Sequence, residues 1–155
     1  MDGFETFEPA LRKGLISVEP CLTDPALFLH EDEQDGHPRR TYVRFEGTKV
    51  TAMAMICPAP NYEGHRCFQV AYAVPEHLRR QGRAKEVLRA TLKDFQAYVE
   101  DSGGRVYYIE AMIGAENLAS QRVAEAVIVG RPIQTVEKHS GKPAVQYLMR
   151  VEIDA

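Results

Sequence analysis

The sequence has few of the residues that would tie it to a membrane, a metal or a disulfide framework. No stretch approaches the ~18 consecutive apolar residues of a membrane-spanning helix, and residues 1–5 are acidic, without the apolar core of a signal peptide. The three cysteines, Cys21, Cys57 and Cys67, are an odd number at no metal-binding spacing. We therefore expect a soluble cytoplasmic protein with buried thiols, no metal and no membrane partner.

The chain also lacks an excess of positive charge. The formal net charge is −3 and the pI is about 6.0, whereas a nucleic-acid surface is usually basic overall, so no nucleic-acid partner is expected. Of the 155 residues, 45% are hydrophobic and 26% are charged, and there are no repeats, linkers or low-complexity tracts. This composition predicts one globular domain over residues 1–155, with the clearest patterning in residues 42–151.

What the sequence does contain is organised around residues 67–101. Residues 67–74 are apolar, aromatic and β-branched, as in a buried strand. From Ala84 onward, mostly apolar residues recur at spacings of three and four, as on one face of a helix: Ala84, Val87, Leu88, Thr91, Leu92, Phe95 and Val99. Pro75 has no N–H to donate to a ladder and ends the strand. The stretch predicts a strand, a turn and a long helix.

The turn before this helix, residues 79–84, predicts an anion site. The first turn of a helix leaves about four backbone N–H groups without partners and carries roughly half a positive charge. Gly82 and Ala84 have almost no side chain to hold a ligand away from these groups, and three arginines add positive charge: Arg79, Arg80 and Arg83. Neither a Walker loop nor the Rossmann glycine spacing is present. The alternative is an ordinary helix start with solvated arginines.

These residues resemble the acetyl-coenzyme A motif of the GNAT superfamily of N-acyltransferases. Val74-Pro75 followed by Arg79-x-x-Gly82-x-Ala84 is similar to the pattern Arg/Gln-x-x-Gly-x-Gly/Ala after a strand that ends near Val-Pro. Downstream, Ile109-Glu110-Ala111 and residues 116–125 (ENLASQRVAE) are similar to I-E-A…N-x-x-S-x-R-V-x-E of the ribosomal-protein N-terminal acetyltransferase branch. The resemblance covers roughly residues 42–150 and implies an acetyltransferase with acetyl-coenzyme A as acyl donor.

Other patterns place the remaining elements. Residues 42–45 and 50–56 flank a glycine-containing turn and predict a hairpin, whose second strand we expect Pro58 and Pro60 to end. Residues 105–113 predict a strand that follows the long helix in a right-handed parallel β-α-β crossover. Further elements are a helix over 118–127 capped by Asn117 and a terminal hairpin of residues 133–138 and 144–151.

With the resemblance, these elements predict an α/β (α+β) fold of the GNAT type. Its central sheet is expected to be mixed, mostly antiparallel and about six to seven strands wide. Three side chains of the terminal strand, Tyr147, Met149 and Val151, could pair across a homodimer.

The first forty residues are weakly patterned. Residues 11–18 and 26–30 could be short strands or turns around Pro20 and Pro25. Residues 31–38 (EDEQDGHP) predict an acidic loop. Such a charge run is either a solvated surface or a docking lip for a cationic amine substrate, and the sequence leaves both open.

The resemblance also implies where an acyl donor would lie. Its diphosphate would be bound by the N–H groups of residues 80–84, with Gln81 in the turn, and its pantetheine arm would run along the backbone of Tyr72 and Val74. The acceptor ammonium, with a pKa of ~10.4, must lose a proton to a base within hydrogen-bond reach. In the resembled enzymes a glutamate of the following strand has this role, which makes Glu110 the candidate here. The rival bases are His65, His77 and Glu63, which we expect in loops near the same strand end.

The departing thiolate needs a proton, and here the sequence departs from the family. Many relatives have a tyrosine seven residues after the motif asparagine, where this chain has Ala124, and Ile128-Val129 replaces their glycine-aromatic pair. Asn117 and Ser120 are the candidates to assist the thiolate, although Ser120 could equally be an ordinary helix residue. Two functions stay open: acetyl transfer to a primary amine on a protein amino terminus or a small molecule, or non-catalytic acyl-coenzyme A binding as a sensor or interaction module.

Overall fold

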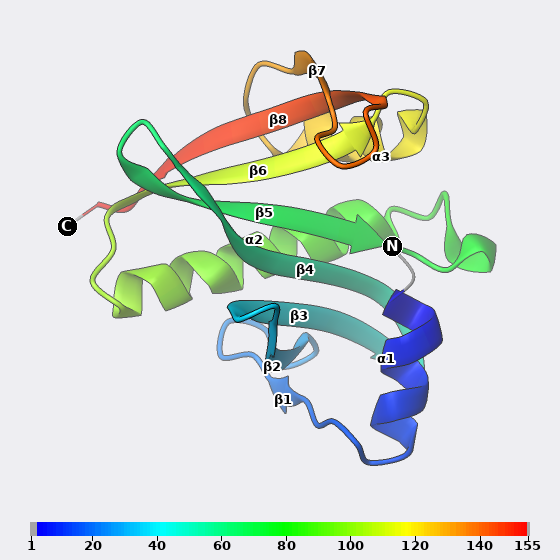
Figure 1. The fold of residues 1–155 in the computed structure, drawn as a ribbon. Coiled ribbons are helices and arrows are strands. Elements are labelled where there is room, and N and C mark those ends of the chain that lie inside the picture. The colour runs from blue at the N-terminus through cyan, green and yellow to red at the C-terminus, as the bar shows by residue number, and fades with distance from the viewer. Residues whose placement is uncertain (1–2, 155) are drawn as a thin grey trace.

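The fold is built on one eight-stranded sheet, described over residues 3–154 by a computed structural model (Figure 1). The strands are β1 (Glu19–Pro20), β2 (Phe28–Gln34), β3 (His37–Glu46), β4 (Lys49–Tyr62), β5 (His65–Ala73), β6 (Val106–Gly114), β7 (Ile133–Val136) and β8 (Pro143–Glu152). Their order is β1-β2-β3-β4-β5-β6-β8-β7, and only β5 and β6 pair in parallel. The mixed, mostly antiparallel sheet with its crossover and terminal hairpin confirms the predicted fold class, although it has eight strands rather than the six to seven expected.

Helices cover both faces of this sheet. They are α1 (Gly3–Arg12), the 3-10 helix η1 (Glu76–Leu78), α2 (Arg83–Asp101) and α3 (Leu118–Val127). α2 runs along the sheet behind β4 and β5 in Figure 1, and Leu88 and Phe95 join the main core cluster with Phe68 of β5. α3 adds Ala124 to the same cluster. Burying a side chain such as Phe95 contributes about 1.5–3 kcal/mol, so this apolar face holds α2 in place.

The long helix begins and ends close to the predicted residues. It begins at Arg83, where Gly82 has a φ of 76° that an L side chain adopts only with strain. It ends before Gly103 and Gly104, and the Gly104 N–H bonds the Val99 carbonyl at 3.0 Å. A Cβ at Gly104 would lie 2.5 Å from a Val99 methyl carbon, so the tight exit requires glycine there.

α1 was not predicted. Phe4 and Phe7 recur at helical spacing and pack against Val43 and Met53 on the sheet face opposite to α2. Pro9 lies inside this helix, where proline removes a backbone donor and costs stability. Packing of the two phenylalanines on the sheet outweighs this cost over a helix of ten residues.

The expectation about the end of β4 was wrong. Pro58 and Pro60 do not end β4, which continues to Tyr62. β3 pairs with β4 only as far as Ile56, so beyond that point β4 has β5 on one side and no paired strand on the other among the described residues. The prolines therefore lie on a stretch of sheet edge, where a strand tolerates them.

The acidic segment 31–38 is not a loop but the tip of the β2–β3 hairpin. Its turn is Asp35-Gly36, with positive φ at both residues (52° and 78°), as a two-residue hairpin turn requires. Asp32 lies opposite Arg39 and accepts its Nε hydrogen bond at 2.9 Å. Glu31 lies opposite Arg40 and forms an ion pair with it at 3.4 Å. Cross-strand arginines thus compensate the charge run and let it form a strand.

The C-terminal strand has a neighbour on both sides only over residues 143–146, where β7 pairs with it, and beyond them it pairs with β6 alone among the described strands. β8 lies between β6 and β7. Tyr147 is 1% exposed, and Met149 and Val151 pack against the main core cluster. These three side chains therefore pack in the protein's own core, and the pairing across a homodimer stays a prediction.

The three cysteines are free thiols, as expected. Burial raises the pKa of Cys21 to about 12 and that of Cys67 to about 11, which keeps both thiols protonated and unreactive. Cys57 is only half-buried. Within residues 3–154, no helix is long and apolar enough to cross a membrane.

Candidate active site

The candidate site lies where two parallel strands separate. β5 and β6 pair only between residues 66–69 and 107–110, and the last matched pair is Gln69 with Glu110. β5 then continues to Ala73 beside β4, while β6 continues to Gly114 beside β8. Figure 1 shows the arrowheads of β5 and β6 well apart. Among the described strands, nothing pairs with the edge of β5 that faces away from β4 after this point, and its backbone groups there are available to a ligand.

At the end of β5 the chain turns into α2 through residues 79–84, here called the amide turn. Arg80 and Gly82 both have positive φ, 65° and 76°. No hydrogen bond within residues 3–154 uses the backbone N–H groups of residues 80–84, although the Gly82 carbonyl accepts from Glu86 at 3.1 Å. The amide turn therefore presents unpaired donors at the positive end of a 19-residue helix. The sequence predicted this arrangement.

The three arginines of the amide turn differ in their contacts. Arg79 donates from Nε to the Val74 carbonyl at 3.0 Å, which joins the amide turn to the end of β5. Arg83 donates to Glu46 at 3.0 Å and to Gln81 at 3.2 Å. Arg80 is exposed and forms no ion pair within the described residues. The charge of Arg83 is thus shared with Glu46, while Arg79 and Arg80 carry theirs without a carboxylate partner.

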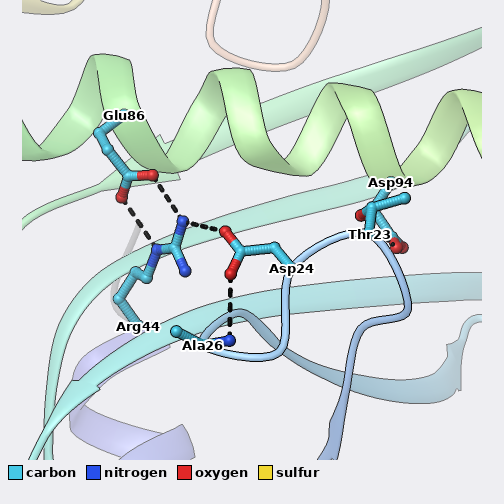
Figure 2. Close-up of polar contacts among 6 residues, drawn as sticks. All are labelled: Thr23, Asp24, Ala26, Arg44, Glu86 and Asp94. Atoms are coloured by element: carbon cyan, nitrogen blue, oxygen red, sulfur yellow. Dashed lines mark hydrogen bonds and ion pairs between the residues drawn. The ribbon is translucent and has the colours of Figure 1, made fainter.

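A hollow of about 440 Å³ adjoins the amide turn and shares Gly82 with it. Three basic side chains of α2 line it at four-residue spacing: Lys85, Arg89 and Lys93. Its two carboxylates, Asp24 and Glu86, both accept from the Arg44 guanidinium, as Figure 2 shows. Because Arg44 compensates these acids, the hollow keeps its positive character next to the unpaired amides.

Glu110 marks the point of strand separation and faces away from α2. Its neighbours Ile109 and Ala111 belong to the core cluster beneath α2, and side chains alternate along a strand, so Glu110 lies on the other face. It is half-buried, and its Oε2 accepts a hydrogen bond from Gln146 Nε2 at 2.7 Å. A single carboxylate thus stands beside the last paired residues of β5 and β6.

The start of α3 forms the boundary of the site on the side of α2. Asn117 caps this helix, since its Oδ1 accepts from the Ser120 N–H at 3.1 Å. The Tyr72 hydroxyl of β5 donates to the Ser120 carbonyl at 2.6 Å. Burial raises the pKa of Tyr72, so its phenol stays protonated. Ala124, where many relatives have tyrosine, is fully buried. The structure thus brings Tyr72, Asn117 and Ser120 together, with the Tyr72 side chain as well as its backbone involved.

Two of the rival bases are at the wrong end of β5. Glu63 and His65 belong to the β4–β5 turn, and the His65 ring lies 6.2 Å from that of Tyr108. They precede Gln69 by six and four residues, at about 3.3 Å per residue, whereas the strands separate after Gln69. His77 lies exposed in η1, near the amide turn. The expectation that all three share one strand end was wrong for Glu63 and His65, because the sequence does not show which end of β5 opens.

Comparisons with known proteins agree with this arrangement. A family model described as "Acetyltransferase (GNAT) family" matches residues 7–127. No curated protein matches the sequence significantly. Among solved structures, yncA from Salmonella typhimurium, in complex with its cofactor acetyl-CoA, is 20% identical with a TM-score of 0.52, over 77% of this chain and 66% of that one.

Two further solved structures are similar, and one of them is a ribosomal-protein acetyltransferase by name. Ribosomal-protein-alanine N-acetyltransferase from Brucella melitensis is 20% identical with a TM-score of 0.51, over 77% of this chain and 70% of that one. RimJ from Mycobacterium smegmatis, in complex with a CoA-disulfide, is 16% identical with a TM-score of 0.58, over 75% of this chain but 54% of that one. At these identities the likeness is one of fold.

Proposed function

The chain belongs to the acetyltransferase (GNAT) family, and from that membership we propose that it transfers an acetyl group from acetyl-coenzyme A to a primary amine. The observation that carries the proposal is the position of two features around one strand end. The unpaired donors of residues 80–84 follow β5, and Glu110 stands where β6 leaves it. These positions support a diphosphate site and a base on either side of the same opening.

The residues present suit the acyl donor. A Cβ added at Gly82 would meet no atom within 4 Å, so space is open in front of the amides. We expect the N–H groups of residues 80–84 to bind the diphosphate, with Arg79, Arg80 and Gln81 beside it. The backbone of Tyr72 and Val74 would hold the pantetheine arm at the unpaired edge of β5. When bound, the donor supplies an activated thioester.

Glu110 is proposed as the general base. The acceptor arrives as an ammonium ion and must lose a proton before its nitrogen can attack. One Glu110 oxygen accepts from Gln146, and the carboxylate retains capacity to accept the acceptor's proton. Holding amine and thioester in line supplies several kcal/mol of the barrier in addition, as roughly expected for well-oriented reactants.

Ser120 is proposed to assist the leaving thiolate. Asn117 uses its side-chain oxygen to cap α3, so it acts by fixing the helix start rather than by donating a proton. The Ser120 backbone is fixed on both sides, by Asn117 at its N–H and by Tyr72 at its carbonyl. Its hydroxyl can rotate to donate a hydrogen bond. Ala124 supplies no such group, so this chain would rely on Ser120 or solvent at that step.

The acceptor is proposed to be the free amine of a peptide or protein. The face of the sheet that carries Glu110 also holds a hollow of about 230 Å³ under α1, lined by Phe7, Met55 and Asp32 among others. Met55 lies opposite Ala71, which follows Gln69 on that face. The ribosomal-protein substrate named for the Brucella structure favours a peptide amine over a small metabolite.

The proposal is tested by measuring turnover. Acetyl-coenzyme A is incubated with short peptides that have free amino termini, and with small primary amines, while a chromogenic thiol reagent reports release of free thiol. Amine-dependent release is expected for the wild type, and Glu110→Gln should lower kcat by about 100-fold, within the range for general bases. Binding of acetyl-coenzyme A without turnover on any amine would contradict the proposal and favour a non-catalytic binder.

A further inference from the structure

A side chain of the terminal hairpin reaches Glu110. Gln146 lies in β8 opposite Met112 of β6, and its Nε2 donates to Glu110 Oε2 at 2.7 Å. Glu110 itself lies opposite Leu148, so the two side chains meet diagonally across antiparallel strands, within reach of long side chains. Both are half-buried. The bond joins residues 36 positions apart and depends on the β6–β8 register.

The chemistry of the pair fixes which atoms face each other. An ionised carboxylate only accepts hydrogen bonds, so the amide must present its NH₂ group to Glu110. A hydrogen bond to a charged acceptor is stronger and more directional than one between neutral groups. Within residues 3–154, no side chain donates a hydrogen bond to the other carboxylate oxygen, Oε1. Gln146 therefore restrains rotation of the carboxylate and leaves one oxygen for a further donor.

We propose that Gln146 is a positioning residue for acetyl transfer, which holds Glu110 so that Oε1 meets the acceptor ammonium. The inference rests on the proposed role of Glu110 as the base. The proton passes from the acceptor nitrogen to Oε1, while both amide protons stay on Gln146, so no further reactant is needed. A base that rotates freely spends little time in the reactive orientation, and small misplacements at a reacting centre cost rate.

The test is a double-mutant cycle of Gln146→Met and Glu110→Gln, measured as amine-dependent thiol release from acetyl-coenzyme A. Methionine keeps the length of glutamine and removes the donor. Gln146→Met should lower kcat roughly 10- to 100-fold with little change in KM for acetyl-coenzyme A. In the Glu110→Gln background the same change should have no further effect, because Gln146 acts only through that carboxylate. A merely structural role would lower the melting temperature and act equally in both backgrounds.

Gln134→Met is the matched control. Gln134 is exposed on β7 of the same hairpin and should tolerate the change with wild-type kcat. Wild-type kcat for Gln146→Met, alongside the expected loss of kcat in Glu110→Gln, would overturn the positioning role and leave the base assignment intact. Equal decreases in kcat from Gln146→Met in both backgrounds would also overturn the positioning role. Full activity of Glu110→Gln would overturn the role of Glu110 as base and with it the inference, whereas no thiol release with any amine would overturn the proposed function as well.

Discussion

Among single residues, Arg44 does most to organise charge at the start of α2. It extends from β3 and donates to Asp24 at 2.6 Å and from Nε to Glu86 at 2.9 Å, so one guanidinium joins the loop before β2 to the first turn of the helix (Figure 2). Its side chain is only 17% exposed. The sequence shows three charged residues far apart and does not predict their meeting, because the conformation of the loop is set by tertiary contacts.

Replacing Arg44 with Met should make stability less sensitive to acid. The hydrogen bond from Arg44 lowers the pKa of Asp24 below its ordinary 3.8. A lowered carboxyl pKa contributes stability that is complete above the unfolded pKa, near 4, and is lost as pH falls through the folded pKa. We expect Arg44→Met to be less stable than the wild type by about 1–2 kcal/mol at pH 7. The difference in free energy of unfolding between the two proteins, measured from urea unfolding curves, should become smaller below pH 4.

Arg12→Met is the control for this comparison. Arg12 is 62% exposed and lies 4.0 Å from Glu8, so its loss should change stability by less than ~0.5 kcal/mol at any pH. The assigned role of Arg44 would be contradicted if the difference in free energy of unfolding between Arg44→Met and the wild type stayed constant from pH 7 to pH 3.

Between elements, one hydroxyl connects β5 to α3. Tyr72 donates to the Ser120 carbonyl across 48 positions of sequence. The two strands on either side of the candidate site separate at Gln69, so this bond spans elements that the sheet no longer joins. It therefore helps to set the position of the α3 start.

Removing that hydroxyl should destabilise the protein slightly. Tyr72→Phe loses one half-buried hydrogen bond, which is worth about 1 kcal/mol. Tyr62→Phe is the control, because the Tyr62 hydroxyl takes part in no hydrogen bond found within residues 3–154 and its ring contact with Tyr108 would be kept. Equal free energies of unfolding for the two variants, measured in urea, would show that the Tyr72 bond does not contribute.

A helix or strand can be predicted from the sequence when the interactions that form it lie within a few residues of one another. α2, the N-cap at Asn117 and the terminal hairpin were predictable, because spacing, capping and turn residues act within a few positions. α1 was missed because its formation depends on packing against Val43 and Met53, far along the chain. Gln146 was missed for the same kind of reason. Its contact with Glu110 follows only from the β6–β8 register, which cannot be read from a local sequence pattern.

For the whole molecule, the sheet brings two candidate features to one opening. The amide turn follows β5, Glu110 lies in β6, and the two strands separate after four parallel residue pairs, the last of which includes Glu110. The strand-turn-helix part of this arrangement was predicted from residues 67–101, because proline, glycine and helical periodicity lie together in sequence. The separation of β5 from β6 was not predicted, since it depends on the pairing of β5 with β4 and of β6 with β8.

The most direct test of the account is a calorimetric titration of acetyl-coenzyme A against the wild type, Gly82→Ala and Gly82→Glu. Both variants place a Cβ at a φ of 76° and share its strain, but only glutamate brings a negative charge to the amide turn. We expect Gly82→Glu to bind about 100-fold more weakly than Gly82→Ala, a difference of about 2.7 kcal/mol. Equal affinities of the two variants would show that the diphosphate is not held by residues 80–84.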